Sequence, residues 1–90
     1  MIETAQSRLK RLSMRSWRRG TKEMDLVLGP WSDVHLASLT FERLDLYEEL
    51  LAENDQDLMS WILEQAAPPA HLADFLTEIS TYARERMRKV

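Results

Sequence analysis

Few side chains in this sequence have the type and spacing that catalysis or metal binding requires. The two histidines, His35 and His71, lie far apart in the chain and lack the i, i+4 pairing or neighbouring cysteines of a typical zinc site. The acidic run at 54–57 opens like a calcium loop, but it lacks the glycine and the closing glutamate and fits a helix N-cap better. No serine lies in a G-x-S-x-G turn, and two isolated glycines do not form a phosphate-binding loop. The sequence therefore predicts a protein that is not itself an enzyme.

The most informative polar cluster is R-R-G-T-K-E at residues 18–23. A helix end, a glycine and a new helix would explain this pattern without any function. In a functional interpretation, an exposed turn with a guanidinium before it and a carboxylate after it offers directional, charge-assisted hydrogen bonds to a partner. The glycine also lets another backbone approach closely. Both interpretations require two helices that meet at this turn.

The composition predicts one small soluble domain that contains those helices. The chain has 90 residues, of which 44% are apolar and 30% charged. It contains no cysteine, which excludes disulfides and thiolate chemistry. No apolar run approaches the roughly 18 residues that a membrane-spanning helix needs. We therefore expect a single all-α domain, a five-helix bundle over residues 1–90.

Helical periodicity predicts which side chains face the core of this bundle. Apolar residues recur three and four positions apart, and no strand-like alternation persists. The expected inward-facing residues are Ile2, Ala5, Leu9 and Leu12, then Trp31, Val34, Leu36 and Leu39, then Phe41, Leu44, Tyr47, Leu50 and Leu51, then Leu58, Trp61 and Ile62, and finally Leu72, Phe75, Leu76, Ile79 and Ala83.

Glycine, proline and capping residues predict where the helices begin and end. We expect Gly20 to end the first helix as a left-handed C′ residue and Thr21 to cap the second. Gly29-Pro30 should kink or break that second helix. Thr40 should cap the third helix, Asp55 or Asp57 should start the fourth, and the fifth should begin at about Pro69 or Ala70.

The charges are segregated along the chain. Residues 1–22 carry seven basic side chains and one acidic one, whereas residues 23–79 carry one basic and thirteen acidic side chains. A stripe of arginines along the first helix (Arg8, Arg11, Arg15 and Arg18) permits a nucleic-acid-binding module as an alternative function. The acidic middle of the chain would repel a phosphate backbone, so a protein partner is favoured over nucleic acid.

Two stretches of the sequence resemble a known family. The first is R-R-G-T-K-E-M-D-L at residues 18–26, followed by L-V-L-G-P-W, and the second is L-L-A-E-N-D-Q-D-L-M-S-W-I at residues 50–62. Together they resemble the R-G-x-x-E signature and the second characteristic stretch of the SdhE-type FAD assembly factors, the succinate dehydrogenase flavinylation family. The resemblance covers about residues 8–80. This sequence departs from the family pattern in its polar Thr21-Lys22 pair and in Gln56, where proline is frequent.

The resemblance implies a function carried out on a partner protein. Family members are small helical bundles that bind the flavoprotein subunit of succinate dehydrogenase, and often that of fumarate reductase, and promote covalent attachment of FAD to a histidine of that subunit. The signature implies partner contacts at Arg19, Gly20 and Glu23, with Asp25 as the trailing acid. It implies no cofactor of the factor's own, because the FAD belongs to the partner.

Three further residues are expected to extend this contact surface. Arg15 and Arg18 lie beside the signature on the first helix, where they could steer an acidic partner. Trp17 falls outside both the apolar and the arginine stripes, and tryptophan is enriched at interface centres, although packing against a neighbour also explains such a residue. Because the chain begins almost at the domain, bacterial cytoplasm is expected rather than the mitochondrial matrix.

Overall fold

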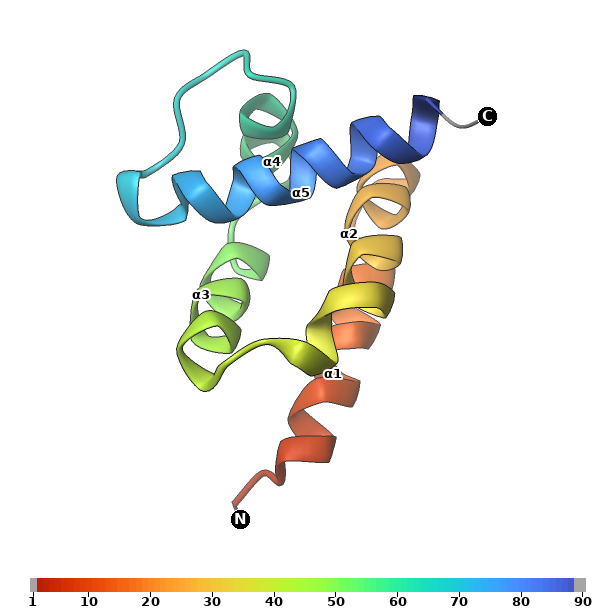
Figure 1. Cartoon of the computed structure of the whole chain (residues 1–90), viewed down its shortest axis with the longest axis vertical. Coiled ribbons are helices and arrows are strands. Elements are labelled where there is room, and N and C mark those ends of the chain that lie inside the picture. The colour runs from red at the N-terminus through yellow and green to blue at the C-terminus, as the bar shows by residue number, and fades with distance from the viewer. Residues whose placement is uncertain (1, 89–90) are drawn as a thin grey trace.

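The computed structural model describes residues 2–88, which form five α-helices and one 3₁₀ helix without a strand. The elements are α1 (Ala5–Trp17), α2 (Lys22–His35), η1 (Leu36–Ser38), α3 (Phe41–Leu51), α4 (Asp55–Ile62) and α5 (Ala70–Arg88). The predicted all-α five-helix fold is confirmed. Figure 1 shows α1 and α2 as an antiparallel hairpin and the C-terminal half of α5 lying across the first turns of α2.

Side-chain caps start four of these helices. In each case an oxygen of the cap accepts a hydrogen bond from the backbone N–H three residues later, which satisfies a donor that the helix itself cannot pair. The caps are Thr4, Thr21, Thr40 and Asn54. Capping by Thr21 and Thr40 is thus confirmed, and the fourth helix begins at Asp55 with Asn54 before it.

Aromatic rings from three helices form the centre of the core. The ring of Trp31 lies 5.1 Å from that of Tyr47 and 5.2 Å from that of Phe75, measured between centroids. The hydroxyl of Tyr47 is hydrogen-bonded to Ser16 Oγ at 2.5 Å, and Ser16 in turn donates to the Leu12 carbonyl. Burial raises the pKa of Tyr47 to about 12. This polar pair ties α1 to α3 inside an otherwise apolar core.

Four residues expected in the core are instead exposed, namely Ile2, Ala5, Val34 and Phe41. The exposed fraction is 94% for Ile2, 62% for Val34 and 73% for Phe41. Ile2 precedes the first residue of α1, and Phe41 is the first residue of α3, so each stands at an end that no other helix covers. Val34 lies in the last turn of α2. Periodicity alone predicted these four positions wrongly because it does not show where a neighbouring element stops.

The expected break at Gly29-Pro30 is also wrong, because α2 continues through both residues. Gly29 is buried under the Trp17 ring, and a β-carbon there would lie 2.4 Å from Cδ2 of the indole. Pro30 has no N–H and so leaves the Leu26 carbonyl without its helical donor. Nη1 of Arg86 on α5 donates to that carbonyl at 3.4 Å. Packing from α1 and a hydrogen bond from α5 thus accommodate the pair within one helix.

This contact predicts that the effect of Gly29→Ala depends on Trp17. Helix propensity alone favours alanine by roughly 1 kcal/mol, but overpacking against a ring typically costs about 1–3 kcal/mol. We expect Gly29→Ala to lower the free energy of unfolding in the wild-type chain and to raise it in a Trp17→Ala background. Urea unfolding of the four proteins measures this coupling. Equal effects in both backgrounds would contradict the assigned contact.

Candidate functional site

The turn between α1 and α2 is held in place by carboxylates from α2 and α4. The N–H of Arg19 donates to Oδ1 of Asp25 at 2.6 Å, and the N–H of Gly20 donates to Oδ2 of Asp55 at 2.6 Å. Both N–H groups follow the last residue of α1, where the chain has left the helix and an acceptor must come from elsewhere. We call residues 18–23 the signature turn. Its backbone is thus fixed by hydrogen bonds that are shorter than usual because the acceptors are charged.

Gly20 is required here for space rather than for a left-handed conformation. No glycine of the described chain has a positive φ, and the C-cap of α1 is Arg18. The predicted left-handed C′ role of Gly20 is therefore wrong. A β-carbon at Gly20 would lie 2.9 Å from Oδ2 of Asp55, which is too close for ordinary contact. Any other residue would push away the carboxylate that holds the turn.

Arg19 is directed inward and braces the junction of α3 and α4. Its side chain is only 10% exposed, and Nε donates to Oδ1 of Asp55 at 2.8 Å. Nη1 donates to the Leu51 carbonyl at 2.7 Å and Nη2 to the Glu53 carbonyl at 2.8 Å. Carbonyls at a helix C-terminus have no helical donor, so the guanidinium supplies one to the Glu53 carbonyl and shares the Leu51 carbonyl with Arg15. All three of its nitrogens are thus used within the protein.

The rest of the signature turn faces solvent. Arg18, Gly20, Lys22 and Glu23 are exposed, and no hydrogen bond or ion pair joins the Glu23 carboxylate to another residue in the part of the chain that the structure describes. The predicted site residues therefore divide into two groups. Gly20 and Glu23 are available to a partner, whereas Arg19 and the half-buried Asp25 hold the turn from inside.

Asp55 is the central residue that sequence reasoning missed. It was predicted only as the start of a helix, yet its two oxygens bind both Arg19 and Gly20. Arg19 is in one of the two sequence stretches that carried the family resemblance, and Asp55 is in the other. That the two stretches belong to one signature was the one available signal, since a single sequence does not show that position 55 contacts position 19.

The arginine stripe of α1 is largely neutralised by α3. Arg8 pairs with Asp45 at 2.6 Å and with Glu48 at 3.1 Å, and Arg11 pairs with Glu48 at 2.9 Å. Arg15 donates to the Leu51 carbonyl at 3.2 Å. These contacts pack α1 on α3. The alternative nucleic-acid function is weakened because three of its four proposed phosphate ligands already have partners.

This network predicts a loss of stability in acid. Hydrogen bonds from Arg11, with a smaller contribution from Arg8, hold the pKa of Glu48 below its usual value near 4.5. A lowered folded-state pKa means that the stabilisation is present above the unfolded-state pKa and disappears as the pH falls through the folded-state value. The expected effect is less than about 1 kcal/mol because the pair is partly exposed.

Urea unfolding from pH 7 to pH 2 should show a smaller acid-induced loss of unfolding free energy for Glu48→Gln than for wild type. The exposed Glu85→Gln should behave as wild type, and a Glu48→Gln profile identical to wild type would contradict the prediction.

Neither histidine forms part of a metal site in residues 2–88, where no cluster of three or more potential ligands occurs. The ring of His35 stacks on Trp31 with centroids 4.9 Å apart, and His71 lies 3.0 Å from Oε2 of Glu49 at the surface. The acidic run at 54–57 supplies the Asn54 cap of α4, as expected. Within the described chain no helix is both long and apolar enough to cross a membrane.

Trp17 combines packing with partial exposure. Its ring covers Gly29, its Nε1 donates to Oδ1 of Asp33 at 3.1 Å, and 39% of the residue is still exposed. The exposed Met14 lies three residues before it on the same helix. Packing against α2 explains why this tryptophan falls outside both stripes of α1.

Comparison with known proteins identifies one family. The family model described as flavinator of succinate dehydrogenase matches residues 10–83. Curated relatives are named "Succinate dehydrogenase assembly factor 2, mitochondrial". The chain is 41% identical to the Aspergillus terreus protein over 56 residues, 62% of this chain and 19% of the relative. It is 41% identical to the Meyerozyma guilliermondii protein (66% and 44%) and 37% identical to the Dictyostelium discoideum protein (78% and 48%).

Two consequences follow from these matches. The chain spans between about a fifth and about half of the length of these relatives. The expectation of bacterial cytoplasm is contradicted, because the relatives are eukaryotic proteins whose names place them in mitochondria. That expectation rested on where the chain begins, which does not determine a compartment.

Proposed function

Since the chain belongs to the family described as flavinator of succinate dehydrogenase, we propose that it binds the flavoprotein subunit of succinate dehydrogenase and promotes covalent attachment of FAD to that subunit. The match over residues 10–83 and the names of the relatives support this function. The relatives are named as assembly factors, which agrees with a role other than that of an enzyme. The flavoprotein subunit of fumarate reductase is a second partner in this proposal.

The contact surface in this proposal is the exposed part of the signature turn. One observation carries the assignment: Asp25, Asp55 and Arg19 fix the backbone of the turn from inside, while Gly20 and Glu23 face solvent. A contact that is already ordered loses less conformational freedom on binding. Arg19 and Asp25 are then positioning residues. The exposed Arg18 and Trp17 would flank the contact, and Arg15 would contribute only through its bond to α3.

This chain would act by holding its partner rather than by supplying a reactive group. Formation of the bond between flavin and protein requires a near-attack geometry and stabilisation of the developing charge. A rigid helical bundle bound through a fixed turn can restrict a mobile segment of the flavoprotein to that geometry. The FAD, in this proposal, is held by the flavoprotein, and this chain has no cofactor of its own.

Co-expression tests the proposed function directly. The flavoprotein subunit of succinate dehydrogenase is produced with and without this chain, and covalent flavin is read as fluorescence of its band on a denaturing gel. We expect a strong flavin band only when the chain is present. Equal fluorescence in both samples would overturn the proposal. The same experiment with the fumarate reductase subunit decides separately whether the second partner belongs to it.

A further inference from the structure

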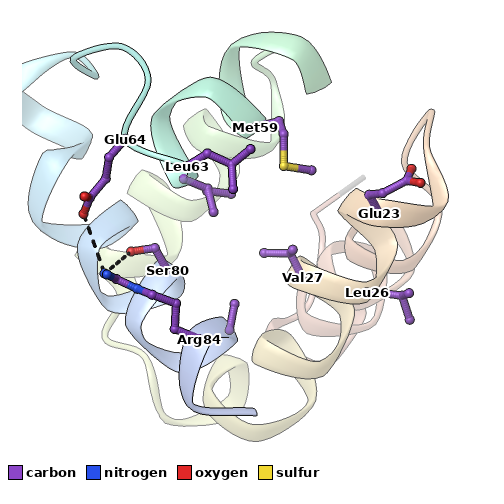
Figure 2. A pocket seen from close by; sticks show the side chains of 10 residues that line it. Glu23, Leu26, Val27, Met59, Leu63, Glu64, Ser80 and Arg84 are labelled. Atoms are coloured by element: carbon purple, nitrogen blue, oxygen red, sulfur yellow. Dashed lines mark hydrogen bonds and ion pairs between the residues drawn. The ribbon is translucent and has the colours of Figure 1, made fainter. Parts of the chain in front are cut away.

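An apolar hollow of about 380 Å³ opens between α2, α4 and α5 (Figure 2). This volume is in the range of roughly 300–1,000 Å³ that is usual for binding pockets. Its apolar lining consists of Leu26, Val27, Met59, Ile62, Leu63 and Ala83. Leu26 and Leu63 are 52% and 56% exposed, so the apolar surface is open to solvent and continues onto the rim. We call this hollow the α2–α4–α5 groove.

The groove is continuous with the signature turn. A second hollow of about 240 Å³ is lined by Thr21, Glu23, Asp55, Gln56 and Met59. It shares Glu23 and Met59 with the groove, so the two hollows adjoin. A molecule bound at the signature turn can therefore extend directly into the groove.

The charges around the groove leave one carboxylate without a counterion. Glu64 and Arg84 pair across one side at 3.6 Å, and Arg84 also donates to Ser80 Oγ (Figure 2). Glu23 stands on the opposite side, with no ion pair among residues 2–88. A carboxylate beside an apolar surface attracts a cation more strongly than one surrounded by water. The groove therefore favours a ligand that is apolar and carries a positive charge near Glu23.

Glu64 occupies an unusual backbone conformation at the rim of this groove. Its φ of 62° is in the left-handed region, and within residues 2–88 it is the sole residue other than glycine with a positive φ. This conformation typically costs about 1–2 kcal/mol for a residue with a β-carbon. Glu64 follows the C-cap of α4, where glycine is the usual residue. With glutamate at this position, a carboxylate lies opposite Arg84 and forms the far rim of the groove.

We propose that the α2–α4–α5 groove binds an amphipathic segment of the flavoprotein partner, one that carries a lysine or arginine next to two apolar side chains. The apolar side chains would occupy the space beside Met59 and Leu63, and the cation would pair with Glu23. This inference rests on the proposed function and adds a second contact to the signature turn. Buried apolar anchors at the centre with polar and charged groups at the rim are the usual arrangement of a specific interface.

Two other occupants fit the groove less well. FAD would bring an anionic pyrophosphate close to Glu23 and Glu64, where like charges repel. A second copy of this chain has a formal net charge of -3 and would bring its own Glu23 and Glu64, so it complements the unpaired carboxylate less well than a basic segment does. Charge complementarity therefore favours a basic segment from a different protein.

A matched pair of variants tests the groove. Leu63→Lys places a cation in it, and Val34→Lys places one on an exposed apolar residue away from it. Both positions are at the C-terminal end of a helix and are similarly exposed, at 56% and 62%, and a lysine is favourable at that end. Binding is measured with the purified FAD-free flavoprotein subunit. We expect Leu63→Lys to weaken binding by about tenfold or more, as for a hot-spot residue, and Val34→Lys to leave it within about twofold.

A second variant and a crosslink identify the occupant. Leu26→Lys places a cation at the other side of the groove and should also weaken binding to the flavoprotein subunit. Because it changes a different helix, it distinguishes a loss of the contact from a folding defect caused by Leu63→Lys. A photoreactive phenylalanine analogue at position 63 should crosslink to a flavoprotein segment with a lysine or arginine beside apolar residues, identified by mass spectrometry. A crosslinked segment without a basic residue would overturn the proposed chemistry.

The outcomes separate the groove from the proposed function. If wild type binds the flavoprotein and promotes flavin attachment while Leu63→Lys and Leu26→Lys match Val34→Lys, the groove proposal is wrong and the function stands. If wild type neither binds nor promotes attachment, both are wrong. The groove proposal would also be overturned if the wild-type chain bound FAD alone and Leu63→Lys abolished that binding. The same holds if the wild-type chain sedimented as a dimer and Leu63→Lys sedimented as a monomer.

Discussion

Replacing Arg19 with alanine is expected to lower the free energy of unfolding by about 3 kcal/mol. The change removes the three hydrogen bonds that Arg19 donates, one each to Asp55, the Leu51 carbonyl and the Glu53 carbonyl. The carboxylate of Asp55 is 16% exposed, so it would keep the Gly20 N–H as a donor but be left largely desolvated without its cation. Removing one partner of a buried ion pair lowers stability more than removing one partner of an exposed pair, because water cannot solvate the charge that remains buried. Urea unfolding measures the change.

The neighbouring arginine is the control for this prediction. Arg18 is exposed, and no ion pair joins it to another residue between positions 2 and 88, so Arg18→Ala should alter stability by less than about 0.5 kcal/mol. Arg19→Lys should recover only part of the loss, because an ammonium group cannot reach three separate acceptors as a planar guanidinium does. Equal stability of the Arg18 and Arg19 variants would contradict the bracing role of Arg19.

Replacing Glu23 with alanine is expected to abolish most covalent flavin attachment while leaving the bundle folded. The carboxylate is exposed, and the loss of a favourable charge at a helix N-terminus typically costs only about 0.3–1 kcal/mol. In the proposed function, however, this carboxylate is the charged contact of both the signature turn and the adjoining groove. Flavin fluorescence after co-expression and urea unfolding, made on the same variant, measure the two effects independently.

The chain provides a closely matched control in Glu42. Glu23 and Glu42 each occupy the second position of a helix that a threonine caps, and both are exposed. Glu42→Ala should therefore cause the same small loss of stability without affecting flavin attachment. If Glu23→Ala folds normally and flavin attachment persists, Glu23 is not a contact residue. Equal loss of attachment in both variants would point to a general effect of helix stability.

These two predictions separate residues that the signature presents together. Arg19 and Glu23 are four positions apart, and from sequence both were expected to contact the partner. The structure directs Arg19 inward to Asp55 and leaves Glu23 exposed. Variants of Arg19 should thus reduce function through stability, whereas variants of Glu23 should reduce it through binding.

Local features of the sequence were enough to predict the helices and most of the core. Apolar spacing of three and four residues and the caps Thr21 and Thr40 are local features, and local hydrogen bonds and burial of one face are enough to realise them. The two characteristic stretches were sufficient to indicate the family, because a signature of this kind is linear.

The roles of the polar residues depend on contacts between segments that are distant in the sequence. Whether an arginine is a brace or a contact depends on the acceptor opposite it, and Asp55 lies 36 positions from Arg19 along the chain. The same holds for Gly29 under Trp17 and for the Leu26 carbonyl under Arg86, which together keep α2 continuous through Pro30. The groove beside Glu23 likewise exists only where α2, α4 and α5 meet. Side-chain type and spacing specify what a residue can bind, but packing between distant segments decides which of those bonds it forms.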